Sequence, residues 1–209
     1  MTAAETVIVL HGLYMSRLFM APLGGRLGDA GYRVVYFSYP TLGRRPADNA
    51  RLLAARVEAL EAPVVHFVAH SLGGVVVRHL AACHPALPPG RVVTLGTPHA
   101  GSRVAVALRQ RGPGWLLGRS IDQGLLGDLP PWPAGRELGS LAGTLNVGVG
   151  RLLADLPEPA DGTVAVAETC FPGMTDHCCL PVSHTGLLVS PAVAGQVCAF
   201  LASGRFHHR

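Results

Sequence analysis

The sequence predicts one α/β domain, a mostly parallel sheet with helices on both faces. Three observations favour this class. Short apolar runs that suit buried strands alternate with stretches of helical spacing through the N-terminal half. The 209 residues are 49% hydrophobic and only 14% charged, which suits a single well-filled core. We find no internal repeat and no linker, so residues 1–209 are expected to form one domain.

In the N-terminal half, strands and helices are expected in regular alternation. The apolar run Thr6–Leu10 ends at His11-Gly12, and a second run ends at Pro40. The expected order is strand Thr6–Leu10, helix Gly24–Ala30, strand Tyr32–Pro40, helix Asp48–Leu60 with Asp48 as N-cap, strand Val64–Val68, helix Leu72–Cys83 and strand Arg91–Gly96. Helical crossovers between strands predict a parallel sheet.

Between residues 101 and 159, strand and helix patterns no longer alternate regularly. "RGPGWLLGRS" and "LPPWPAG" are rich in glycine and proline, and we expect loops there that cross the carboxyl end of the sheet. Any lid must come from this segment, so we expect a minimal one at most, and a role for Trp115 or Trp132 in it stays open. The remaining expected elements are one strand within Leu138–Val149, strands Thr163–Thr169 and Cys178–Val182, and a helix near Pro191–Leu201.

Composition excludes several classes of function. The formal net charge is +4 and every one of the 17 basic residues is arginine, so lysine chemistry such as Schiff-base formation is excluded. The arginines are scattered, which predicts no nucleic-acid partner. Five cysteines without regular spacing indicate neither a disulfide framework nor a zinc site. We expect them to be small apolar core residues, with a Cys170–Cys178 bridge as the open alternative.

The N-terminus shows no basic leader, and no stretch approaches the ~20 apolar residues of a membrane span. A cytoplasmic location without an integral membrane segment is the expectation. The oligomeric state cannot be predicted from the sequence.

Ser71 stands at the junction between the expected strand Val64–Val68 and the expected helix Leu72–Cys83. A sharp strand-to-helix turn needs small residues two before and two after the serine, and Ala69 and Gly73 occupy those positions. The pattern is a nucleophile elbow with alanine in its first place. An ordinary helix-capping serine is the alternative, which the surrounding strand, small residues and helix disfavour.

Five segments in order resemble the α/β-hydrolase superfamily, in particular small bacterial lipases and esterases. They are "LHGLYM", "AHSLGG", "LGTPHAGS", "ADGTVAVAET" and "VSHTGLL", which together reach from residue 10 to residue 188. The resemblance implies the α/β-hydrolase fold and hydrolysis of carboxylic esters without a cofactor or metal. The alanine at the first elbow position looks like the AHSxG variant of certain small Bacillus lipases.

A serine nucleophile needs a base, and chain order in this fold is Ser, acid, His. The histidines after the elbow are His99, His177, His184, His207 and His208. His184 follows the last expected strand, where a loop can lean over Ser71, so we predict it as the base. His177 precedes that strand and should lie at the opposite edge, and His99 is expected to be a structural loop residue near the pocket.

The acid that orients the base is predicted to be Asp161. Eight carboxylates lie between Ser71 and His184: Asp122, Asp128, Asp155, Asp161, Asp176, Glu137, Glu158 and Glu168. Asp161-Gly162 forms a turn just before an expected strand, and in the resembling lipases a D-G-x-V segment supplies the acid. Asp176 is the rival, and an ordinary Asp-Gly turn is the structural alternative.

Two backbone N–H groups should stabilise the oxyanion. One is that of Leu72, directly after the nucleophile. By resemblance the other is that of Leu13, and Gly12 would let its backbone approach closely. Apolar residues predicted to bind a hydrophobic acyl group are Tyr14, Met15, Leu18 and Leu187.

The sequence therefore predicts an esterase or lipase that uses Ser71, His184 and Asp161 and an acyl-enzyme intermediate. The same triad could serve a thioesterase, phospholipase or acyltransferase. A non-catalytic binding protein with this fold is the remote alternative. The physiological substrate and the length of its acyl chain stay open.

Overall fold

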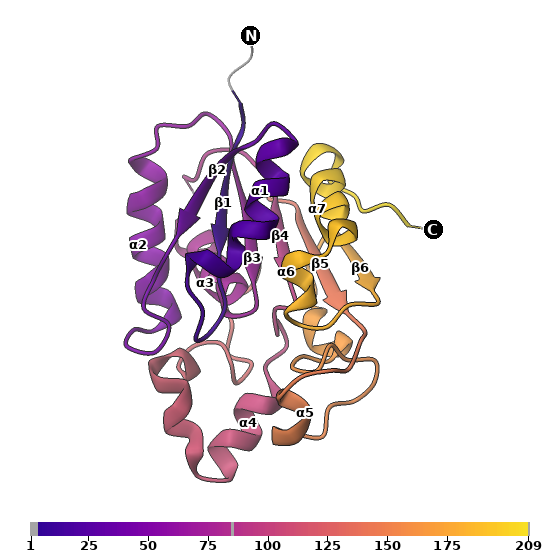
Figure 1. The fold of residues 1–209 in the computed structure, drawn as a ribbon. Helices are drawn as coiled ribbons and strands as arrows, with labels where there is room; N and C mark the ends of the chain where they lie inside the picture. Colours follow the sequence, from indigo (N-terminus) through magenta and orange to yellow (C-terminus); the bar gives the residue numbers. More distant parts are fainter. Residues whose placement is uncertain (1–3, 85, 209) are drawn as a thin grey trace.

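The computed structural model describes residues 4–84 and 86–208, and it confirms a parallel sheet between two helical layers. The six strands are β1 (Thr6–Leu10), β2 (Arg33–Phe37), β3 (Val65–His70), β4 (Val92–Leu95), β5 (Leu138–Gly143) and β6 (Asp176–Leu180). They lie in the order β2-β1-β3-β4-β5-β6, and each neighbouring pair is parallel. All carboxyl ends therefore meet at one edge, the lower edge in Figure 1.

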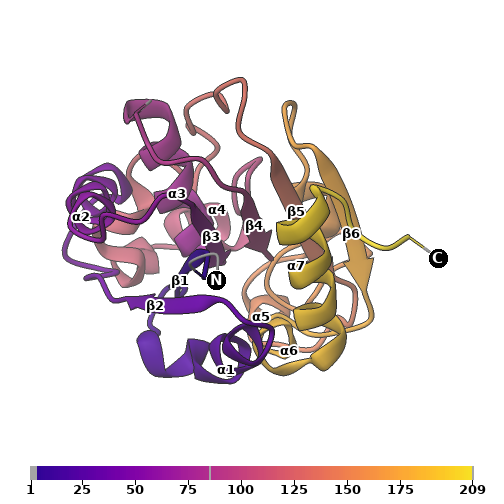
Figure 2. The same cartoon turned by 90° about the horizontal axis from the view of Figure 1, so that it is seen from above.

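Helices cover both faces of the sheet (Figure 2). The α-helices are α1 (Ala21–Asp29), α2 (Pro46–Glu58), α3 (Leu72–Cys83), α4 (Arg103–Gln110), α5 (Gly150–Leu153), α6 (Gly186–Val189) and α7 (Pro191–Ser203). Val7 and Val9 of β1 pack with residues of α1 and α7, whereas Ile8 and Leu10 pack with residues of α2 and α3. Strand side chains alternate between faces, so a strand covered on both sides must be apolar throughout.

The helix that follows Ser71 is confirmed with the predicted bounds, but the predicted N-cap of the preceding helix is wrong. That helix, α2, begins at Pro46, with Arg45 as N-cap and Asp48 in the first turn. Proline fixes the backbone dihedral that the first helical position needs and has no N–H to leave unpaired.

The predicted strand Thr163–Thr169 is also wrong, because its end forms the 3₁₀ helix η3 (Val166–Thr169). The buried Glu168 carboxylate accepts hydrogen bonds from the backbone N–H groups of Ala165 and Arg103, each at 2.6 Å. These two bonds fold the segment back toward the start of α4. Alternating valines and alanines thus occupy a turn rather than an extended strand.

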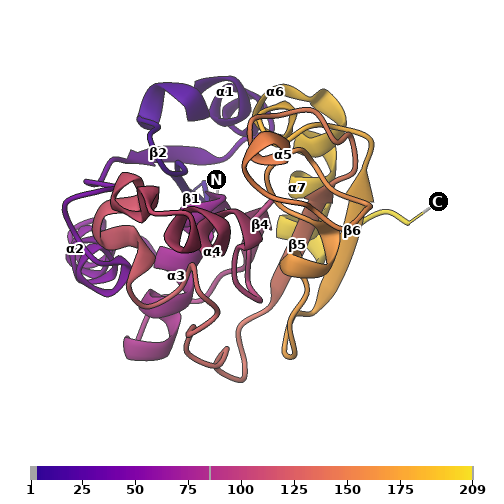
Figure 3. The same ribbon diagram turned by 90° about the horizontal axis from the view of Figure 1, so that it is seen from below.

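Segment 103–121 is helical rather than a loop. Besides α4 it contains the 3₁₀ helix η2 (Pro113–Ile121), which holds most of "RGPGWLLGRS" and is kinked at Gly118, where φ is 53°. Figures 1 and 3 show α4, the following coil and α5 gathered at the carboxyl ends of the strands. Trp115 of η2 is largely exposed. A shorter 3₁₀ helix, η1 (Arg17–Met20), precedes α1.

"LPPWPAG" is a loop, as predicted, but it runs toward the amino end of β5 rather than across the carboxyl edge (Figure 2). Trp132 packs against the core there. Its indole N–H donates to the carbonyl of Arg136 at 2.7 Å.

All five cysteines are free thiols, so the alternative Cys170–Cys178 bridge is absent. The expectation of core cysteines holds for Cys178 alone, because Cys83 and Cys179 are exposed and Cys170 and Cys198 are half-buried. In the part of the chain that the structure describes, no helix has the length and apolarity to cross a membrane.

Candidate active site

Ser71 occupies a strained turn between β3 and α3. Its φ is 53° and its ψ is −120°, a combination that residues with a side chain rarely adopt. The turn is held by its neighbours: the Ser71 N–H donates to Leu95 O at 2.9 Å, and the Thr97 hydroxyl donates to Ser71 O at 2.9 Å. The side chain does not cap α3 and is partly exposed, so its hydroxyl is presented at the carboxyl edge.

Two glycines allow the loop after β1 to pack directly against this turn. A Cβ at Gly73 would lie 2.9 Å from the carbonyl oxygen of His11. A Cβ at Gly12 would lie 3.0 Å from the Cβ of Ser71 and 3.0 Å from Nδ1 of His70. A side chain at either position would therefore collide with its neighbours, which explains why glycine occupies both.

Asp161 and His184 form a hydrogen-bonded pair. Nδ1 of His184 lies 2.7 Å from Oδ2 of Asp161, and both side chains are buried. The other carboxylate oxygen accepts the backbone N–H groups of Thr163 (2.9 Å) and Val164 (2.7 Å). Because an ionised carboxylate only accepts hydrogen bonds, Nδ1 of a neutral His184 carries the proton and Nε2 has the lone pair.

This pair lies over the carboxyl ends of β4 and β5. A Cβ on Gly96, the residue after β4, would lie 3.0 Å from both Oδ2 of Asp161 and Nδ1 of His184. A Cβ on Gly143, the last residue of β5, would lie 2.8 Å from the Cβ of Asp161. Ser71 follows the adjacent strand β3, so the three predicted residues share one edge of the sheet.

His70, which sequence reasoning did not single out, links Ser71 to His184. Its imidazole Nε2 lies 3.0 Å from the carbonyl oxygen of His184, and the two ring centroids are 4.5 Å apart. No hydrogen bond joins the Ser71 hydroxyl to His184 within the described residues, and such bonds are often long before substrate binds.

The backbone N–H groups of Leu13 and Leu72 donate to no protein acceptor among the hydrogen bonds of the described residues. Leu72 is the first residue of α3, where a helix leaves its N–H groups unpaired. Leu13 follows Gly12, where an added Cβ would lie 3.0 Å from the Cβ of Ser71. Both groups are thus available to an external acceptor.

The rival histidines and acids lie elsewhere. His99 is buried, and its Nε2 lies 3.0 Å from the Thr94 hydroxyl; burial lowers the pKa of His99 to about 3. Asp176 is the first residue of β6, at the amino edge, where it contacts His208 at 2.9 Å. The neighbouring His177 belongs to β6 rather than preceding it, but it does lie toward the amino edge, as expected.

The apolar residues predicted to bind substrate fall into two groups. Tyr14 and Leu18 are 59% and 74% exposed, and Met15 is half-buried, in the segment that follows Leu13. Leu187 is fully buried, and a Cβ built on Gly96 would lie 2.9 Å from its Cδ1 and 3.0 Å from atoms of Asp161 and His184. Leu187 therefore exposes no surface to a ligand in this structure.

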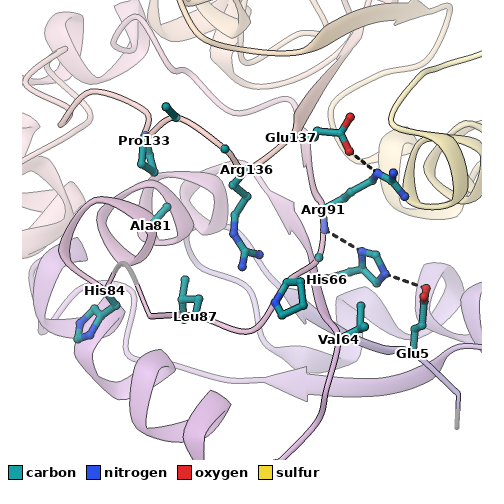
Figure 4. A pocket seen from close by; sticks show the side chains of 14 residues that line it. Glu5, Val64, His66, Ala81, His84, Leu87, Arg91, Pro133, Arg136 and Glu137 are labelled. Carbon is teal, nitrogen blue, oxygen red and sulfur yellow. Dashed lines mark hydrogen bonds and ion pairs between the residues drawn. The ribbon is translucent and has the colours of Figure 1, made fainter.

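A cavity of about 590 Å³ lies at the opposite, amino edge of the sheet (Figure 4). Two polar pairs lie in its lining, Arg91 with Glu137 at 2.6 Å and His66 with Glu5 at 3.0 Å. The Arg136 guanidinium donates to the backbone carbonyls of Val65 and Pro88. Ser71, Asp161 and His184 are not among the residues that line the cavity, so we do not place the reaction there.

Comparison with known proteins agrees with this architecture. A family model described as a domain of unknown function, DUF7379, matches residues 12–111. A curated relative, the putative carbamate hydrolase RutD of Variovorax paradoxus (strain S110), is 36% identical over 91 residues. That match covers 39% of this chain and 34% of RutD, so the chain matches about a third of that relative's length.

Two solved structures are similar over nearly the whole chain. The mature Bacillus licheniformis lipase BlEst2 has a TM-score of 0.77 at 20% identity, covering 97% of this chain and 92% of that one. The RedJ thioesterase of the prodiginine pathway in Streptomyces coelicolor has a TM-score of 0.64 at 16% identity, covering 96% and 91%. The likeness is one of fold, and the chain has the α/β-hydrolase fold.

Proposed function

We propose that this chain is a serine hydrolase that cleaves hydrophobic carboxylic esters, with Ser71 as nucleophile, His184 as base and Asp161 as the orienting acid. One observation carries the proposal: the 2.7 Å bond from His184 to Asp161, which leaves Nε2 of His184 as the proton acceptor at the edge where Ser71 stands. A serine hydroxyl becomes an effective nucleophile when such a base accepts its proton.

In the first half-reaction, the Ser71 oxygen attacks the ester carbonyl while Nε2 of His184 takes the hydroxyl proton. The oxyanion receives the N–H groups of Leu13 and Leu72, and the positive end of α3 favours the same charge. The ester C–O bond then breaks, and His184 returns the proton to the departing alkoxide. Water repeats these steps on the acyl-Ser71 ester, releasing the acid; no cofactor takes part.

The exposed side chains of Tyr14 and Leu18 and the half-buried Met15 support a hydrophobic acyl group. Tyr14 and Met15 follow Leu13 directly and Leu18 belongs to the same segment, so an acyl chain whose carbonyl binds the Leu13 N–H would pass beside this segment. Burying apolar surface of this kind against an alkyl chain contributes about 25 cal/mol of binding free energy per Å² removed from water.

A thioester or carbamate is the second candidate substrate. The observation behind it is the similarity to proteins named a thioesterase and a putative carbamate hydrolase. A thioester would give an acyl-Ser71 intermediate with release of a thiol, and a carbamate would give a carbamoyl-Ser71 intermediate with release of an alcohol.

The test combines covalent labelling with a substrate series. Intact-mass analysis after treatment with a fluorophosphonate should show one adduct in the parent and in Ser203→Ala, an exposed serine of α7, and none in Ser71→Ala. p-Nitrophenyl esters from two to sixteen carbons would measure the acyl preference. Hydrolysis rates of thioesters and aryl carbamates of equal chain length, compared with those of the esters, would separate the ester from the thioester or carbamate as the preferred substrate. A folded parent without an adduct on Ser71 would overturn the proposal.

A further inference from the structure

The last residue of β3, His70, lies between the proposed nucleophile and the proposed base. It directly precedes Ser71 and is fully buried. Its Nε2 is 3.0 Å from the carbonyl oxygen of His184, and its ring packs on the His184 ring with centroids 4.5 Å apart and planes inclined by 49°. The contact therefore spans 114 positions of sequence.

The direction of this hydrogen bond fixes the state of the ring. A carbonyl oxygen only accepts, so Nε2 of His70 carries the hydrogen and donates it. Nδ1 has no hydrogen-bond partner within the described residues, so nothing there favours a second ring proton. Burial, together with the neighbouring His184 and His11, keeps the pKa of His70 well below its ordinary value. A neutral His70 places no fixed positive charge beside His184 when the latter takes the serine proton.

His184 makes two further hydrogen bonds, both of them to Asp161. Its backbone N–H donates to Asp161 O at 2.9 Å, and its Nδ1–H donates to Oδ2. These bonds orient the imidazole relative to the acid but not relative to the nucleophile. Among the hydrogen bonds of residues 4–84 and 86–208, the bond from His70 is the one that joins His184 to the β3–α3 turn.

We propose that His70 is a positioning residue that holds the His184 loop at the distance from Ser71 that proton transfer requires. The inference rests on the proposed function. Misplacing a reacting group by about 1 Å can cost roughly 10²-fold in rate. Loss of the bond should therefore slow the attack of Ser71 more than it weakens substrate binding.

The test compares two buried histidines on one strand. His66 lies on the same face of β3 but at the amino edge, where its ring accepts the Arg91 N–H at 2.9 Å and contacts Glu5. In His70→Phe we expect kcat for a p-nitrophenyl ester and the rate of phosphonylation to fall by ~10–100-fold, with KM within about threefold of the parent. His70→Gln, whose amide can donate near the Nε2 position, should recover most of both rates. His66→Phe should retain them.

Several outcomes would overturn the inference. Full rates in a folded His70→Phe, or an equal loss in His66→Phe, would show that His70 has no special role. If His70→Phe does not fold, His70→Gln is compared with His70→Asn, whose shorter amide cannot reach the His184 carbonyl. We expect the glutamine variant to be about tenfold faster, and equal rates would contradict the proposal. A parent not labelled at Ser71 would overturn the proposed function together with this inference, whereas a labelled parent separates the two.

Discussion

His184 is bound to Asp161 at two points, one on its imidazole and one on its backbone. Nδ1 donates to the carboxylate at 2.7 Å, and the backbone N–H of His184 donates to the carbonyl of Asp161 at 2.9 Å. The carboxylate is itself held by the N–H groups of Thr163 and Val164. The orientation of the Asp161 carboxylate therefore does not depend on His184. This independence lets the carboxylate fix which nitrogen of His184 carries the proton.

Asp161→Asn should abolish most activity without unfolding the protein. The amide oxygen can keep the two bonds to the N–H groups of Thr163 and Val164, but its NH₂ cannot accept the Nδ1–H of His184. The histidine then shifts its proton to Nε2 and can no longer accept one from Ser71, so kcat should fall by about 10⁴-fold. Ester kinetics and urea unfolding would measure both effects.

The control for this substitution is Asp176→Asn, at the amino edge of the sheet. It should leave kcat within about twofold of the parent, because Asp176 contacts His208 rather than His184. Equal losses in the two variants would contradict the assignment of the acid.

The elbow and its helix could be predicted from sequence because their local requirements agree. The strand β3, the small residues and the helix Leu72–Cys83 all follow from patterns within a few residues. The segment after Gly162 could not be predicted in this way. Its alternation suits a strand, but the Glu168 side chain, by bonding Ala165 and the distant Arg103, turns it into η3.

His70 illustrates a second limit of sequence reasoning. Chain order directs the search for the base to histidines after the serine, and a histidine before it receives no functional signal. Its contact with His184 exists because β3 lies beside β4, over whose carboxyl end the His184 loop returns. Only the three-dimensional arrangement brings these positions together.

Because the backbone at Ser71 is strained, we expect a glycine at this position to raise the free energy of unfolding. With φ of 53° and ψ of −120°, any side chain here carries a cost of about 1–3 kcal/mol that glycine avoids. Ser71→Gly should therefore unfold at higher urea concentration than Ser71→Ala, by about 1 kcal/mol, and both should be inactive. At Ser203, the last residue of α7, the order should reverse, with alanine more stable by up to about 0.5–1 kcal/mol. A glycine variant of Ser71 less stable than the alanine variant would refute the strain.

The packing of the elbow against the loop after β1 predicts opposite effects of one added methyl group at two helical glycines. In Gly73→Ala the Cβ would meet the carbonyl oxygen of His11 at 2.9 Å, so backbone must move and stability should fall by about 1–3 kcal/mol. Activity should fall as well, because the same loop carries the proposed Leu13 N–H donor.

The matched substitution is Gly25→Ala in α1, where nothing lies within 4 Å of the new Cβ. It should stabilise the protein by about 0.5–1 kcal/mol through helix propensity alone, with activity unchanged. Thermal unfolding and ester hydrolysis of both variants are the measurements. A Gly73→Ala variant as stable and as active as Gly25→Ala would show that the elbow is not tightly packed.

Neutral histidines that are buried or half-buried should make the protein sensitive to mild acid. Desolvation lowers the pKa values of four buried histidines and of the half-buried His177 below the ordinary 6.5; the four are His11, His66, His70 and His99. Below about pH 6.5 the unfolded chain therefore binds more protons than the folded one, and the free energy of unfolding rises with pH. This stabilisation is present above pH 6.5 and is lost progressively on acidification. Glu168, whose pKa burial raises, opposes the trend only near its own titration.

His99 gives this pH dependence a residue-specific test, because its pKa of about 3 lies far below that of an exposed histidine. Between pH 6 and pH 4 the unfolded chain gains a proton at this position that the folded protein does not. His99→Gln should therefore reduce the slope of unfolding free energy against pH by up to ~1.4 kcal/mol per pH unit, whatever its effect on stability at pH 7. Urea unfolding of the parent and of His99→Gln at half-unit intervals from pH 7 to pH 4 would measure the two slopes, and equal slopes would show that His99 takes up its proton in the folded state.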